Sequence, residues 1–160
     1  SHSIIDAMAI ADTISVIQRG KIIASGEPEK ILQNPLYGFT VSENPNIFRG
    51  DVFVKDSGAV CVNVGCVCMR AVTTLCGTVS VSIRPEEIIV SKDKLQSSAT
   101  NSFTGKITDI TENDAEVFVH VDVGIVLAAA VTKQSLQRLG LKTGETVTLT
   151  FKATAVKVFT

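Results

Sequence analysis

Hydrophobic and polar residues alternate along most of this chain, and a period of two predicts β-strands with one buried face. The alternation is clearest in residues 60–64, 79–83, 115–121 and 124–131. Turn-forming residues separate these stretches, at Ser57-Gly58, Gly65 and Cys76-Gly77. Residues 132–141 have helical spacing instead. The pattern therefore predicts a mainly β fold with one short helix in its last third.

The first 50 residues follow a different pattern. Helical spacing predicts a helix over residues 4–11, and two short apolar runs predict a hairpin from strands 13–18 and 21–25. A short helix is expected over residues 29–33, between two prolines. Residues 35–50 are rich in proline, glycine, asparagine and serine, which is typical of a linker.

Composition narrows the functional classes. The 160 residues are 45% hydrophobic and 19% charged, with a net charge of −1, which is typical of one globular domain or two small ones. Such a small net charge disfavours binding to nucleic acid or to acidic membranes through long-range electrostatic attraction alone. With no Trp and one Tyr, a barrel that stacks single-stranded bases is the weakest alternative. Without an apolar run of membrane-spanning length or a signal peptide, we expect a soluble, cytoplasmic protein.

Four cysteines fall within residues 61–76, and their spacing contains no C-x-x-C pair. A zinc site is therefore not expected, and the cysteines are interpreted as small apolar strand residues with reduced thiols. His120 is interpreted as an outward-facing strand residue and not as a metal ligand.

Two polar patches interrupt the strands of the last third. Small hydroxyls, backbone N–H groups and a lysine are the donors that a compact oxyanion requires. The candidate oxyanion-binding residues are Ser98, Thr100, Asn101, Lys152, Ala153 and Thr154. On local spacing alone the favoured interpretation is an ordinary polar start of a strand and an exposed strand lysine. Thr132 and Ser135 are weaker candidates, because Thr132 more simply caps the helix that follows it.

Three separated motifs give residues 98–160 a resemblance to the Mop (molbindin-type) domain. The matching residues are Ser98, Ala99, Asn101, Gly105 and Ile107, then Val131, Thr132, Ser135, Leu139, Leu141 and Gly144, then Phe151, Lys152, Ala153, Ala155, Val156 and Val158. The resemblance implies an OB-like β-barrel that binds molybdate or tungstate where two copies meet. Thr100 stands where that family often has arginine, so one bidentate cationic donor is missing.

A second resemblance covers the first part of the chain. Residues 2–31 resemble the end of the nucleotide-binding domain of ABC transporters, and residues 46–50 and 82–87 resemble motifs of its TOBE region. His2, with Ala7, matches the switch histidine of that family, unless Ser1-His2 is a cloning remnant. The sequence contains no G-x-x-x-x-G-K-[ST] phosphate loop, so we expect no catalytic residues and no ATP hydrolysis by this chain alone.

Together these resemblances predict a mainly β protein, with OB-like TOBE/Mop barrel lobes preceded by a small α/β remnant of an ABC ATPase domain. The expected divisions are 1–34 for the remnant, 35–50 for the linker, 51–97 for the first lobe and 98–160 for the oxyanion-binding lobe. The implied function is regulation of an ABC importer by cytoplasmic molybdate or tungstate, sensed at a homodimer interface. The implied partners are the missing ATPase domain, which binds ATP, and the permease that holds the subunit at the membrane. The alternative is a TOBE dimerisation module of an importer for another solute.

Overall fold

Strands make up most of the structure, so the predicted mainly β class is confirmed. The structure is a computed structural model that describes residues 11–18, 20–27, 30–31, 46–54, 60–112 and 116–160. Several predicted features lie outside the described residues. They are nearly all of the helix predicted over 4–11, His2, most of the segment 29–33, residues 35–45 and the Ser57-Gly58 turn.

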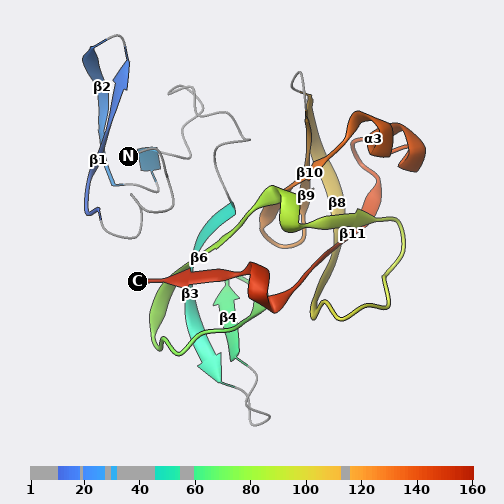
Figure 1. Cartoon of the computed structure of the whole chain (residues 1–160), viewed down its shortest axis with the longest axis horizontal. Helices are drawn as coiled ribbons and strands as arrows, with labels where there is room; N and C mark the ends of the chain where they lie inside the picture. Colours follow the sequence, from blue (N-terminus) through green and yellow to red (C-terminus); the bar gives the residue numbers. More distant parts are fainter. Residues whose placement is uncertain (1–10, 19, 28–29, 32–45, 55–59, 113–115) are drawn as a thin grey trace.

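The elements follow in one order along the chain (Figure 1). Two strands come first, β1 (Ile14–Gln18) and β2 (Lys21–Gly26). The next group is β3 (Asn46–Val54), β4 (Val60–Val64), β5 (Val67–Ala71), β6 (Thr78–Ile83), the 3₁₀ turn η3 (Pro85–Glu87) and β7 (Ile89–Ser91). The last group is β8 (Asn101–Glu112), β9 (Val117–Asp122), β10 (Val126–Val131), α3 (Lys133–Leu139), β11 (Thr146–Phe151), η4 (Ala153–Ala155) and β12 (Lys157–Phe159).

Most predicted elements are observed within a few residues of their expected bounds. Proline does end β6, since Pro85 begins a 3₁₀ turn. One difference concerns the predicted linker, because β3 begins at Asn46 and so includes residues 46–50. There, Asn46 to Asp51 pair with β6, and that pairing accounts for the extended backbone.

The strands after residue 45 form two five-stranded antiparallel sheets of the same design. Their orders are β5-β4-β3-β6-β12 and β10-β9-β8-β11-β7, so β3, β4, β5 and β6 correspond to β8, β9, β10 and β11. The register agrees as well: Asn46 pairs with Ile83 in one sheet, and Asn101 pairs with Phe151 in the other. The chain therefore contains two copies of one structural unit.

The two units exchange their last strands. β7 follows η3 of the first unit but pairs with β11 of the second, while β12 follows η4 of the second unit but pairs with β6 of the first. In Figure 1 the red C-terminal strand accordingly lies beside β6. Each sheet is complete only with a strand from the other unit, so the units are not separate along the sequence.

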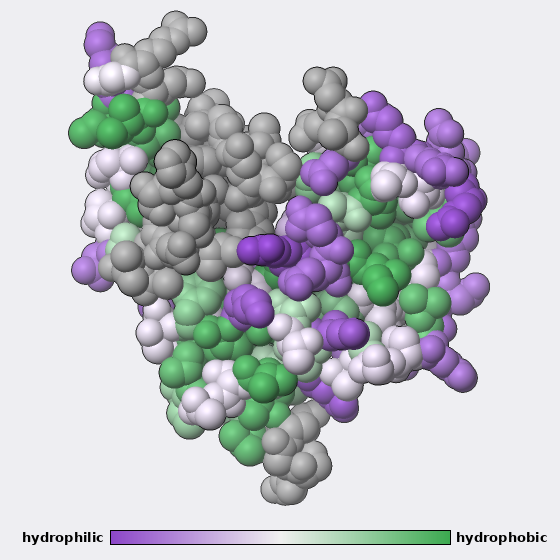
Figure 2. Space-filling model, in the orientation of Figure 1, coloured by the Kyte–Doolittle hydropathy of each residue, from purple (hydrophilic) through white to green (hydrophobic). Residues whose placement is uncertain are grey.

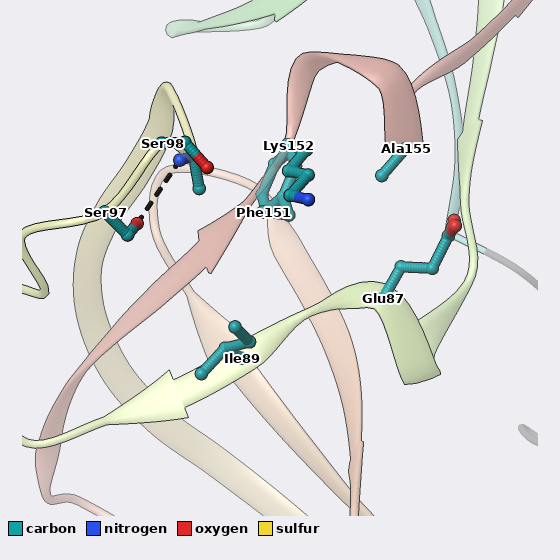
Figure 3. A pocket seen from close by; sticks show the side chains of 8 residues that line it. Glu87, Ile89, Ser97, Ser98, Phe151, Lys152 and Ala155 are labelled. Atoms are coloured by element: carbon teal, nitrogen blue, oxygen red, sulfur yellow. Dashed lines mark hydrogen bonds between the residues drawn. The ribbon is translucent and has the colours of Figure 1, made fainter.

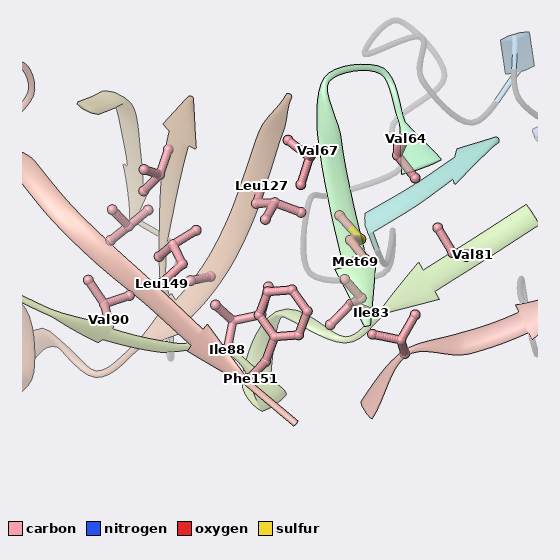
Figure 4. Packing of buried hydrophobic residues seen from close by; sticks show 14 of the residues in the cluster. Val64, Val67, Met69, Val81, Ile83, Ile88, Val90, Leu127, Leu149 and Phe151 are labelled. Carbon is pink, nitrogen blue, oxygen red and sulfur yellow. The ribbon is translucent and has the colours of Figure 1, made fainter. Parts of the chain in front are cut away.

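One apolar core fills the space between the sheets. Figure 4 shows Met69 and Ile83 of the first sheet facing Leu127, Leu149 and Phe151 of the second. All five side chains are almost fully buried. Burial of this kind is the main favourable term in folding, so the two sheets stabilise each other.

Two buried asparagines join the units through the backbone. Asn46, at the start of β3, accepts a hydrogen bond from the Ala128 N–H (2.7 Å) and donates one to the Ala128 carbonyl (2.9 Å). Asn101, at the start of β8, makes the same pair of bonds with Arg70 on β5, at 2.7 and 2.8 Å. Each asparagine thus fixes the first residue of its own sheet to a strand of the other.

The cysteines differ from the sequence interpretation. Cys61 and Cys68 form a disulfide across β4 and β5, with their Cα atoms 5.8 Å apart, while Cys66 and Cys76 are free and exposed. The expectation of four reduced thiols is therefore wrong for this pair. Asn63 pairs with Cys68 in the ladder, which places Cys61 diagonally across from Cys68, within disulfide reach.

Polar and apolar side chains divide the visible surface. Figure 2 shows hydrophilic residues over α3 and apolar surface at the end of β3, where Phe53 and Val54 are 58% and 64% exposed. The β1–β2 hairpin also exposes Ile17 and Ile22, which pair with each other. In the part of the chain that the structure describes, no helix is long and apolar enough to cross a membrane.

Candidate functional site

The candidate patches meet because β8 and β11 are antiparallel. The first residue of β8, Asn101, pairs with the last residue of β11, Phe151. Residues just before Asn101 and just after Phe151 therefore lie at the same end of the sheet. This geometry brings together two segments that are about fifty residues apart in sequence.

A pocket of about 250 Å³ lies at this end (Figure 3). It is lined by Glu87, Ile89, Ser97, Ser98, Ala99, Phe151, Lys152 and Ala155. Of the candidate residues, Ser98 and Lys152 line this pocket. Thr100, Asn101, Ala153 and Thr154 do not. The structure thus joins one hydroxyl and one ammonium group from the two predicted patches.

Asn101 already has partners for its side chain. Its amide oxygen and nitrogen are both bonded to the Arg70 backbone, and the residue is 1% exposed. A bidentate amide pair of this kind satisfies both buried groups. The side chain therefore holds the start of β8, just beyond Ser98, in a fixed position.

The backbone after Lys152 turns at once into η4. The Ala155 N–H donates to the Lys152 carbonyl at 3.0 Å, and the Val156 N–H donates to the Ala153 carbonyl at 3.3 Å. The N–H groups of Ala153 and Thr154 donate to no other described residue. They remain candidate donors just after Lys152.

Sequence reasoning missed the opposite wall of the pocket. Glu87 and Ile89 come from η3 and β7, which belong to the first unit and reach the second by strand exchange. Ser97 was also missed; its hydroxyl accepts a hydrogen bond from the Ala99 N–H at 3.3 Å. A signal was present in the sequence, because Ile83-Arg84-Pro85-Glu86-Glu87 and Phe151-Lys152-Ala153-Thr154-Ala155 occupy equivalent positions after β6 and β11.

The pocket contains one cation and one anion. Lys152 and Glu87 both line it, yet within the described ranges the one ion pair closer than 4 Å is Lys30–Glu27, which is far along the chain on the exposed surface. The ammonium and the carboxylate are therefore each available to a ligand. Ser97 and Ser98 add hydroxyl groups, while Ile89, Phe151 and Ala155 add apolar surface. This arrangement supplies part of the donor shell of a small oxyanion.

The weaker candidates have a structural role. The Thr132 side chain accepts a hydrogen bond from the Ser135 N–H at 3.1 Å, and its hydroxyl lies 3.1 Å from the Ser135 hydroxyl. Thr132 is therefore the N-cap of α3, as predicted. Gly140 ends the same helix with φ of 60°, a left-handed conformation that glycine adopts without strain.

Other polar residues contribute little to a ligand site. His120 on β9 is half-buried, and its burial lowers the pKa of the imidazole, while the charge of Asp109 acts in the opposite direction. Among the described residues, no three His, Cys, Asp or Glu side chains are grouped to hold a metal ion. Arg84 is exposed and forms no ion pair with Glu86 or Glu87.

Comparison with known proteins defines the second unit. Residues 97–158 match the family model of the TOBE domain. This segment is therefore similar to TOBE domains. The molybdate/tungstate import ATP-binding protein WtpC of Pyrococcus abyssi is 28% identical over 99% of the chain and 46% of its own length. The putrescine transport ATP-binding protein PotG of Escherichia coli is 27% identical over 100% of the chain and 45% of its own length. The chain thus spans about half the length of these curated relatives.

A solved structure shares the arrangement of both units. The cytoplasmic molybdate-binding protein ModG, in a crystal form with molybdate bound, matches with a TM-score of 0.63 and 22% identity. The match covers 71% of this chain and 94% of ModG, a larger share than the TOBE domain alone provides. It shows the fold, and the resemblances to TOBE and Mop proteins predicted from the sequence are confirmed.

Proposed function

We propose that this chain is the regulatory oxyanion-binding part of the ATP-binding subunit of an ABC importer for molybdate or tungstate. The main support is the pocket that joins Ser98 to Lys152, because these two residues come from separate polar patches. The similarity to WtpC over nearly the whole chain supports the choice of ligand. In this proposal the N–H groups of Ala153 and Thr154, with Thr100 and the start of β8 at Asn101, border the bound anion.

A dianion needs more donors than one pocket offers. Removing two charges from water is costly unless several hydrogen bonds and a cation replace the lost hydration. Ile89, on the pocket wall, is 54% exposed, which is unusual for a large apolar side chain beside a ligand site. We infer that a second copy of the chain covers this wall and completes the shell. Sulfate has the same charge and shape as molybdate and tungstate. Selection against sulfate therefore depends on the size of the cavity.

Regulation follows from this arrangement. An anion held between two copies favours the dimer geometry that keeps the ATPase domains apart, so import slows when the cytoplasm is supplied. Such a switch works only if the anion binds one geometry more tightly than the other. ATP hydrolysis, contact with the permease and a place at the inner face of the membrane belong, in this proposal, to the longer protein. The switch-histidine role of His2 belongs there too.

Calorimetry of the chain with molybdate, tungstate and sulfate tests the proposal. We expect measurable heats for molybdate and tungstate and much weaker binding of sulfate. Sedimentation in the same buffers should show a dimer that the bound anion stabilises. Equal and negligible heats for all three anions would sink the oxyanion-sensor function.

Replacing Lys152 by alanine tests the central cation. Loss of a charge-assisted hydrogen bond should weaken molybdate binding by about 1.5–3 kcal/mol, or roughly ten- to a hundredfold. Lys142→Ala is the matched control, because Lys142 is another exposed lysine that does not line the pocket. If the two variants bind molybdate equally well, Lys152 is not a ligand.

The second candidate function is a TOBE dimerisation module of an importer for another solute. The similarity to PotG, at nearly the same identity as WtpC, favours keeping this candidate. Under this alternative the chain forms the same dimer with and without oxyanion, and Lys152→Ala leaves its assembly unchanged. Calorimetry and sedimentation together therefore separate the two functions.

A further inference from the structure

Thr150, on β11, is a buried residue whose hydroxyl group has no hydrogen-bond partner. The residue is 1% exposed, and within the described ranges its Oγ1 atom is the one buried side-chain oxygen or nitrogen that forms no hydrogen bond. Buried hydroxyl groups are nearly always hydrogen-bonded, because leaving one unpaired costs stability. Such an exception requires a physical reason, and a position next to a ligand site provides one.

The strand geometry places Thr150 directly behind the pocket. Leu149 and Phe151 face the core, so Thr150 faces the opposite side of the sheet. Lys152 is extended and two residues further on, so its side chain leaves the backbone on the same side as Thr150. Across the ladder, Thr150 pairs with Ile89. Two lining residues of the pocket, Ile89 and Lys152, are therefore immediate neighbours of the Thr150 side chain.

The serines of the pocket approach the same strand from its other side. β7 and β8 flank β11, so the connection between them, residues 92–100, passes from one side of β11 to the other. Figure 3 shows the end of β11 between Ile89 and the serines of this connection, Ser97 and Ser98. Thr150 is not part of the lining, so its hydroxyl lies one layer behind it. The side chains in front, including Lys152, are exposed and therefore able to move aside for a ligand.

We propose that Thr150 is a further ligand of the oxyanion and a specificity-determining residue of the site. When the anion is seated against Lys152, the Thr150 hydroxyl donates a hydrogen bond to one of its oxygens. This bond adds to affinity in full, because no bond within the protein is given up to form it. Sulfate is smaller than molybdate, so its oxygens reach a donor behind the lining less well. The inference rests on the proposed function and adds an inner donor to its site.

Thr148 provides a matched comparison on the same strand. It lies two residues earlier on the same face of β11 and is 3% exposed, but its hydroxyl lies 3.1 Å from the Thr104 hydroxyl, within hydrogen-bond distance. Its ladder partner on β7 is Ser91, which does not line the pocket. The two threonines thus share strand, face and burial, and they differ in whether the hydroxyl is already bonded. Valine has the shape of threonine without the hydroxyl, so it isolates that group.

The test compares Thr150→Val with Thr148→Val in the full 160-residue chain. Urea denaturation without ligand gives the midpoint of unfolding, and calorimetry gives the affinities for molybdate and sulfate. We expect Thr148→Val to lower the urea midpoint and to bind molybdate as wild type does, because it removes a bond within the protein. Thr150→Val should keep or raise the midpoint, bind molybdate roughly ten- to a hundredfold more weakly, and discriminate less against sulfate. Thr150→Ser keeps the hydroxyl and should restore most of the affinity.

Each other outcome contradicts the proposal in a distinct way. If Thr150→Val lowers the urea midpoint as Thr148→Val does, the Thr150 hydroxyl already has a partner within the protein. If Thr150→Val binds molybdate like wild type, the hydroxyl is not a ligand, and the oxyanion site at Lys152 stands. An equal loss of affinity in Thr150→Ser would assign the effect to packing. If wild type binds neither molybdate nor tungstate, the proposed function fails, and this inference fails with it.

Discussion

At the scale of residues, polar side chains of the candidate motifs serve different purposes depending on their burial. Lys152 and Ser98 are exposed at the pocket, where their donors are available to a ligand. Asn101, three residues beyond Ser98, is buried, and both ends of its amide are bonded to Arg70. A polar residue in a candidate motif is thus a ligand or a structural clamp according to whether its donors are already satisfied.

Asn101→Ala should destabilise the protein more than it changes ligand contacts. The substitution leaves the N–H and carbonyl of Arg70, which lie in a part-buried environment, without their side-chain partners, and each such group costs about 1–3 kcal/mol. We expect the free energy of unfolding, measured by urea denaturation, to fall by about 2–4 kcal/mol. Asn46→Ala is the matched variant, since it removes the equivalent bonds to Ala128. A loss of less than about 1 kcal/mol in both would contradict the clamp role.

At the scale of elements, short turns position the site. η3 and η4 each follow the last residue of a central strand and turn the chain toward the other sheet. Lys152 lies immediately before η4, so the end of β11 fixes the point from which its side chain leaves the backbone. Helix α3, by contrast, caps itself through Thr132 and contributes no residue to the pocket.

Thr132→Ala should affect the helix and leave ligand binding unchanged. Loss of the cap leaves the Ser135 N–H without its side-chain acceptor and should lower the free energy of unfolding by about 1 kcal/mol. Thr132→Ser keeps a hydroxyl acceptor and should restore most of that stability. Thermal unfolding and molybdate calorimetry on both variants test this. A clear loss of molybdate affinity in Thr132→Ala would instead support the weaker anion site predicted at Thr132 and Ser135.

At the scale of the whole molecule, the exchange of β7 and β12 makes the two units interdependent. The pocket is built by residues from both units, and it exists because β7 lies on β11. Each sheet also contributes side chains to one core. A change in the last strand of the chain should therefore lower the stability of the sheet that begins at Asn46.

Deleting residues 157–160 tests this interdependence. The deletion removes β12, which pairs with β6 from Lys157–Ser82 to Phe159–Ser80. We expect hydrogen exchange to accelerate first in β6, whose edge becomes unpaired, and later in β9 and β10. Replacing Thr160 alone by alanine is a control, because this residue lies beyond the last paired strand. Exchange that accelerates in β9 and β10 before β6 would show that β12 does not stabilise the first sheet.

Local sequence patterns determined the strands, the helix α3 and its cap, and the two polar patches. Alternation, turn residues and the capping threonine act over a few neighbouring residues, so their signals are readable in the chain itself. The repeat of the unit was also present in the sequence, in the equivalent segments that follow β6 and β11, but its two copies share few identical residues.

Only the tertiary structure decided which patch residues meet and what faces them. Glu87 and Ile89 reach the pocket through strand exchange, and the amide of Asn101 is taken by Arg70 of the other unit. The pairing of Cys61 with Cys68 likewise depends on the register of β4 and β5. All of these are contacts between strands whose partners are set by packing of the shared core, and no local pattern specifies which strand will lie beside which.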